Sequence, residues 1–124
     1  MIPLIRTSQT IDLVCSADPA VHGLADGGLV WRPAASTRHD PGATVATCRP
    51  LSAEEMFRVR QASAGVEHVS HEAMGLEACK LGVVRLSHGV VAELPYFVAV
   101  SLGIEIVGLS TAPPDPNAPI ASES

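Results

Sequence analysis

The sequence predicts a single α+β domain in which a small antiparallel sheet, built by the N-terminal half, packs with helices built by the C-terminal half. Three observations favour this class. Short β-forming runs separated by turn-rich loops fill the first half, apolar residues at helical spacing follow, and a proline-rich segment ends the chain. The 124 residues, 47% of them hydrophobic, are enough for one packed core.

We expect about three strands, each ended by a proline or by turn chemistry, at residues 10–15, 29–32 and 43–49. Asp18 before Pro19 closes the first as a turn pair, Pro33 stops the second and Pro50 stops the third. A loop over 22–28 and a polar loop over 36–42 lie between them. Such short strands favour a small antiparallel sheet.

The start of the first helix is marked by a capping box, Ser52-Ala53-Glu54-Glu55. The Ser52 hydroxyl can accept a hydrogen bond from the backbone N–H of Glu55, whose carboxylate can reach back to the N–H of Ser52. Gly65 is the expected stop.

A second helix is expected from about Glu67 to Leu86, because apolar residues recur there at helical spacing. Gly75 and Gly82 weaken it by up to ~1 kcal/mol each relative to alanine. The same glycines would let another backbone approach closely.

A third helix is expected from Pro95, at its first turn, to Leu109. Ser101, Glu105 and Gly108 fall on one face, so almost all of the remaining surface is apolar. Two interpretations stay open: a central core helix, or a helix shared with a partner. For the second, the candidate partner-binding residues are Phe97, Val100, Ile104 and Val107.

The segment after Thr111 holds four prolines between residues 113 and 119, which predicts an extended or disordered tail. The expected organisation is therefore one domain over 1–111 and a tail over 112–124.

Composition argues against several classes of function. The net charge of −5 and the scattered arginines do not form the basic stripe of a nucleic-acid-binding protein. The longest apolar stretch, 94–109, falls short of the ~20 residues of a membrane span, and the start of the chain has no signal-peptide pattern. Three cysteines without a CxxC spacing indicate reduced thiols in a reducing compartment.

The strongest candidate for a metal site is the pair His68 and His71, at the i, i+3 spacing that can face one ion. The surrounding residues match neither HExxH nor HxxEH, and two ligands leave a site incomplete. Cys79 lies two turns or more from His71. We therefore expect a solvated polar helix face and no metal.

Catalytic motifs are also missing from the sequence. No GxSxG elbow, dinucleotide fingerprint or phosphate loop occurs. Asp12 and Asp18 could pair as acid and base, but Asp18 is more simply a turn residue. Cys15 and Cys48, expected on adjacent strands, are interpreted as small buried hydrophobic residues. We expect no catalytic residue, no cofactor and no enzymatic activity.

Four segments together resemble short proteins encoded among the tail genes of tailed bacteriophages and related gene-transfer particles, many of them described as tail assembly chaperones. The first runs from Ile5-Arg6-Thr7 through residues 10–14 to Ser16-Ala17-Asp18-Pro19, and the second runs from Cys48 to Glu55 and includes Arg49-Pro50-Leu51-Ser52. The third covers residues 78–84, and the last is Leu94-Pro95 followed by residues 103–110.

The resemblance implies a non-enzymatic phage morphogenesis protein that binds a tail component through apolar helix faces in the host cytoplasm. Its partners would be phage structural proteins, with self-association as a second option. The alternative is a structural protein of the virion, either a capsid decoration (cement) protein or a head–tail connector component.

Overall fold

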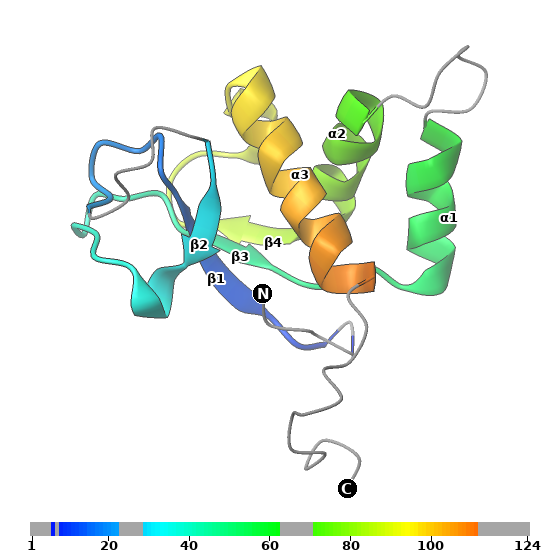
Figure 1. The fold of residues 1–124 in the computed structure, drawn as a ribbon, viewed down its shortest axis with the longest axis horizontal. Coiled ribbons are helices and arrows are strands. Elements are labelled where there is room, and N and C mark those ends of the chain that lie inside the picture. Colours follow the sequence, from blue (N-terminus) through cyan, green and yellow to red (C-terminus); the bar gives the residue numbers. More distant parts are fainter. Residues whose placement is uncertain (1–5, 7, 23–28, 63–70, 112–124) are drawn as a thin grey trace, which may run out of the picture.

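The computed structural model describes residues 6, 8–22, 29–62 and 71–111, and it confirms the α+β class (Figure 1). The elements are, in order, β1 (Ile11–Cys15), β2 (Trp31–Pro33), the 3-10 helix η1 (Ala34–Ser36), β3 (Ala46–Cys48), α1 (Ala53–Ala62), α2 (His71–Gly82), β4 (Val83–Leu86), the 3-10 helix η2 (Val91–Glu93) and α3 (Tyr96–Thr111). The predicted stop at Gly65, the predicted helix start near Glu67, most of the 22–28 loop and the tail 112–124 lie outside the described residues.

The sheet has four strands in the order β2-β1-β3-β4, and every neighbouring pair is antiparallel. The three strands expected from the sequence are present, and β4 is an addition. The prediction of a helix continuing to Leu86 was wrong, because the chain leaves α2 at Gly82 and pairs with β3. The backbone N–H of Arg49 donates to the carbonyl of Gly82 (2.9 Å), so this pairing starts at the last residue of α2.

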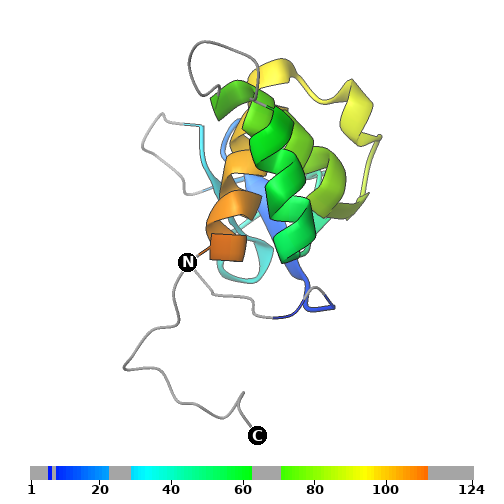
Figure 2. The same ribbon diagram turned by 90° about the vertical axis from the view of Figure 1, so that its right-hand side faces the viewer.

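The helices lie together on one side of the sheet, with α2 between α1 and α3 (Figures 1 and 2). The core joins side chains of all these layers: Leu13, Trp31, Ala46 and Cys48 from the sheet, Val59 from α1, Ala78 and Cys79 from α2, and Leu102 and Ile106 from α3. The third helix therefore contributes directly to the core of its own domain.

Two local predictions at helix starts are confirmed. The N–H of Glu55 donates to the Ser52 hydroxyl (3.2 Å), and the N–H of Ser52 donates to the Glu55 carboxylate (3.0 Å), which completes the capping box. At α3 the carbonyl of Pro95 accepts from the N–H of Ala99 (3.0 Å), so Pro95 stands in the first turn.

Helices α2 and α3 cross with their backbones in contact at Gly75 and Gly103. A Cβ added at Gly103 would overlap the carbonyl oxygen of Gly75, and one added at Gly75 would lie 2.7 Å from the carbonyl oxygen of Val100. The close approach expected at Gly75 is therefore present. This crossing fixes which side of α3 faces α2 and which side faces outward.

Candidate protein-binding surfaces

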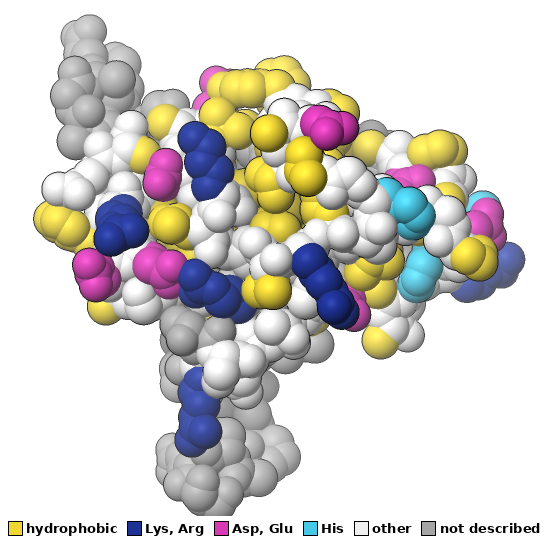
Figure 3. Space-filling model, turned by 180° about the vertical axis from the view of Figure 1, so that it is seen from behind, with side chains coloured by type: hydrophobic (Ala, Val, Ile, Leu, Met, Phe, Trp, Pro, Cys, Tyr) yellow, Lys and Arg dark blue, Asp and Glu magenta, His cyan; other side chains and the backbone are white. Residues whose placement is uncertain are grey.

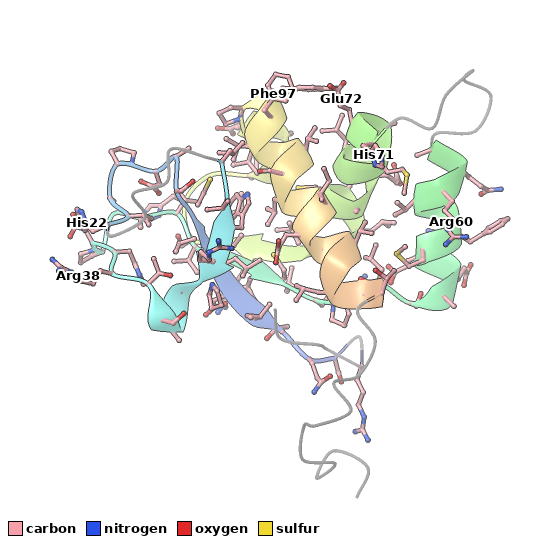
Figure 4. All side chains as sticks on the ribbon, viewed as in Figure 1. His22, Arg38, Arg60, His71, Glu72 and Phe97 are labelled. Atoms are coloured by element: carbon pink, nitrogen blue, oxygen red, sulfur yellow. The ribbon has the colours of Figure 1, made fainter. Side chains whose placement is uncertain are left out.

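The outer face of α3, defined here by Phe97 and Ile104, leaves two large apolar side chains in solvent. Phe97 is 63% exposed and Ile104 is 48% exposed. They stand seven residues apart, so they occupy one stripe of the helix. Figure 4 shows Phe97 at the N-terminal end of α3, near Glu72 of α2. The only charged residue of α3 is Glu105, which lines a separate groove with Arg32 on the side of β2.

The four partner-binding residues predicted from the sequence divide between this face and the interior. Phe97 and Ile104 share the outer face, whereas Val100 is only 6% exposed and Val107 is half-buried against the core. Val100 packs at the Gly75 crossing. The structure therefore brings two of the four together on the surface.

A second apolar surface is a groove between α2, η2 and the first turns of α3. It has a volume of about 520 Å³. The lining residues are Leu76, Cys79, Lys80, Val91, Ala92, Leu94, Tyr96 and Ala99. In Figure 3, which views the molecule from behind, hydrophobic side chains gather in this part of the surface. The α2–η2 groove, as we call it, is large enough to receive an aromatic side chain.

Charged side chains of opposite sign mark the two ends of the α2–η2 groove. At one end the Tyr96 hydroxyl donates to the Glu72 carboxylate (2.7 Å), a bond that raises the pKa of Tyr96. At the other end Lys80 is exposed. Glu72, Leu76 and Lys80 are spaced i, i+4, i+8, so one face of α2 runs from acid through apolar to base over about 12 Å.

The sequence did not predict the α2–η2 groove, although some of the residues that line it lie in predicted helices. Leu76 falls within the second helix expected from the sequence, and Tyr96 falls within the third. The residues of η2 were not assigned at all. The available signal was the short apolar run Val90-Val91-Ala92 between Gly89 and Pro95. Gly89 has a φ of 76°, which turns the chain after β4 toward η2.

Of the histidine pair considered from the sequence, His68 lies outside the described residues. His71 is exposed at the first residue of α2, and its neighbour Glu72 is engaged with Tyr96. Cys79 is fully buried. Over residues 6, 8–22, 29–62 and 71–111, no three His, Cys, Asp or Glu side chains come together as metal ligands would.

The three cysteines are buried thiols. Burial raises the pKa of Cys48 to about 12 and that of Cys79 to about 11, and it also raises the pKa of Cys15. Cys15 and Cys48 lie on the adjacent strands β1 and β3, but the register places Cys48 opposite Ile11. Their role as small buried hydrophobic residues is confirmed.

The two aspartates considered as an acid–base pair serve separate local structures. Asp12 accepts from the Thr47 hydroxyl (2.6 Å). Asp18 accepts from the N–H groups of Ala20 and Thr44 (2.9 Å each), which confirms it as a turn residue.

Comparison of the chain with protein-family models, with curated proteins and with solved structures gave no match. Among the helices that the structure describes, none is long and apolar enough to cross a lipid bilayer.

Proposed function

We propose that this chain is a non-enzymatic protein of phage morphogenesis, a tail assembly chaperone that holds a tail component on the outer face of α3. The observation that carries the proposal is the exposure of Phe97 (63%) and Ile104 (48%) on a helix whose opposite side is core. The class of partner comes from the resemblance to phage tail-region proteins, which is carried by residues 5–7, 10–14, 16–19, 48–55, 78–84, 94–95 and 103–110.

The physical argument is the cost of leaving apolar surface in water. Burying a side chain of this size is worth roughly 1.5–3 kcal/mol, and exposed apolar patches commonly mark protein-binding sites. Phe97 also has its ring edge-to-face with Tyr96 (centroids 5.1 Å apart), so the aromatic anchor is held in place before a partner arrives.

The test is capture of tail proteins on co-expression, with two matched variants. Ile104→Asp places a carboxylate on the outer face of α3 and is expected to reduce the captured tail component at least about tenfold, because the charge would be desolvated on binding. Val84→Asp changes a similarly exposed aliphatic residue (54%) on β4 and should leave capture unchanged. Equal capture by wild type and Ile104→Asp would contradict the assigned surface.

A structural role in the virion is the alternative, and quantitative mass spectrometry of purified particles separates the two. A chaperone is present in the infected-cell lysate and absent from particles. Copy numbers comparable with those of a tail-ring or capsid protein would replace the chaperone proposal with the structural one.

A further inference from the structure

The outward side of α1 carries an exposed aromatic side chain, Phe57, between the acidic Glu54 and the basic Arg58. Phe57 is 61% exposed. Glu54 is 81% exposed at its side chain and is bridged to Arg58 at 3.6 Å, one turn further along α1. Figure 4 shows Arg60 on the same helix, at the side of the molecule away from the sheet. Along α1, therefore, the order is acid, aromatic, base.

The α2–η2 groove presents the complementary order when two helices run antiparallel. An antiparallel α1 would set its N-terminal acid, Glu54, beside Lys80 at the C-terminal end of α2. Arg58 and Arg60, about 6 and 9 Å further along α1, would then lie toward Glu72, which is about 12 Å from Lys80 along α2, and Phe57 would face the apolar groove between the charged ends. A parallel arrangement would place like charges together at both ends and is disfavoured.

We propose that Phe57 of one copy of this chain docks into the α2–η2 groove of a second copy, with α1 antiparallel to α2. The knob (Phe57) and the groove are different surfaces of one chain, and the contact we propose is head-to-tail, with the knob of each copy in the groove of the next. Such a contact generates a ring if the rotation closes and an open chain if it does not. This inference goes beyond the proposed function, since it uses neither Phe97 nor Ile104.

Sedimentation velocity on the full chain at rising concentration tests the contact. Wild type is expected to associate, with a weight-average sedimentation coefficient that rises with concentration. Phe57→Ala removes the knob and Ala92→Trp fills the groove from an exposed position. Each variant alone is expected to weaken association at least about tenfold, as loss of an aromatic anchor does.

The mixture of these two variants is the decisive measurement. The Phe57→Ala chain keeps an intact groove and the Ala92→Trp chain keeps an intact knob, so together they should form a 1:1 heterodimer that grows no further. A contact made through another surface would give no such heterodimer and would overturn the proposal. Wild type that stops growing at the dimer would show reciprocal docking of two copies and would overturn the head-to-tail arrangement. Wild type that stays monomeric throughout would overturn it as well.

Charge reversal checks the antiparallel orientation. Lys80→Glu alone should weaken association, so that a higher protein concentration is needed for it. Adding Glu54→Lys in the same chain should restore association. Failure of the second change to restore association would exclude the pairing of Glu54 with Lys80. Circular dichroism verifies that each variant is folded, and Ile104→Asp should associate as wild type does. Because Ile104→Asp changes the outer face of α3 and leaves Phe57 and the groove unchanged, it separates failure of this contact from failure of the proposed function.

Discussion

Arg49, directly after β3, joins α1 to α2 through its guanidinium group. It donates to the two carboxylate oxygens of Glu55 at 2.8 and 2.6 Å, and it also reaches the carbonyls of Pro50 (3.1 Å) and Leu81 (3.0 Å). Both side chains are mostly buried, at 25% and 18% exposed. Glu55 is at the same time the second half of the capping box. One carboxylate therefore holds the start of α1 to the end of α2 through Arg49.

The same bonds predict how stability depends on pH. The Arg49 hydrogen bonds, with the N–H of Ser52, lower the pKa of Glu55 to about 2. A depressed pKa means that the unfolded chain binds the proton more readily, so this stabilisation is complete above about pH 5 and is lost as the pH falls toward 2. The contribution is on the order of 2–3 kcal/mol. Urea unfolding measured at a series of pH values from about 7 down to about 2 gives this contribution as the loss of unfolding free energy.

Glu55→Gln should unfold more readily at neutral pH and show a smaller loss of stability on acidification. Glu54→Gln is the matched control, since Glu54 lies one residue away with its side chain 81% exposed. Identical pH profiles for wild type and Glu55→Gln would mean that the Arg49 contacts do not stabilise the fold.

At the scale of elements, the sequence predicted the starts of the first and third helices correctly and the end of the second helix wrongly. The capping box at Ser52 and the proline at 95 are local signals, and the structure bears both out. The end of α2 is not a local matter. Leu81 and Val83 continue the helical spacing, yet β3 offers an unpaired edge, and Val83 and Val84 are residues that favour a strand. Tertiary pairing therefore decided the structure of 83–86.

The crossing of α2 and α3 gives a prediction at this scale. Gly103→Ala would gain up to ~1 kcal/mol in helix propensity, but its Cβ would overlap the backbone of Gly75, which cannot rotate away. The helices must separate, so we expect a net loss of about 2 kcal/mol in unfolding free energy. Gly42→Ala is the control, because nothing lies within 4 Å of an added Cβ there. Thermal denaturation followed by circular dichroism distinguishes them, and equal midpoints would contradict the close crossing.

At the scale of the whole molecule, periodicity could show which residues of α3 share a face but not which face turns outward. The sequence predicted that Ser101, Glu105 and Gly108 share the one face of the third helix that is not apolar. In the structure Ser101 accepts from the indole N–H of Trp31 (2.9 Å), and Glu105 faces the groove beside β2. The outward stripe of α3 is instead apolar, because the other sides of α3 pack against α2 at the Gly75 crossing and against the sheet. That packing joins residues far apart in sequence, so no local pattern reveals it.

This orientation of α3 makes the last prediction, which compares Val100→Asp with Ile104→Asp. The two positions are four residues apart, with exposures of 6% and 48%. A carboxylate at 100 would be buried without a partner and should cost at least about 3 kcal/mol of unfolding free energy. At 104 it can reach water, so the cost should stay below about 1 kcal/mol.

Fluorescence of Trp31, the only tryptophan of the chain and 3% exposed, follows urea unfolding of both variants. A folded Ile104→Asp beside a strongly destabilised Val100→Asp is the expected pair. If both variants unfolded alike, the outer face of α3 would belong to the core, and the partner surface proposed on it would have to be abandoned.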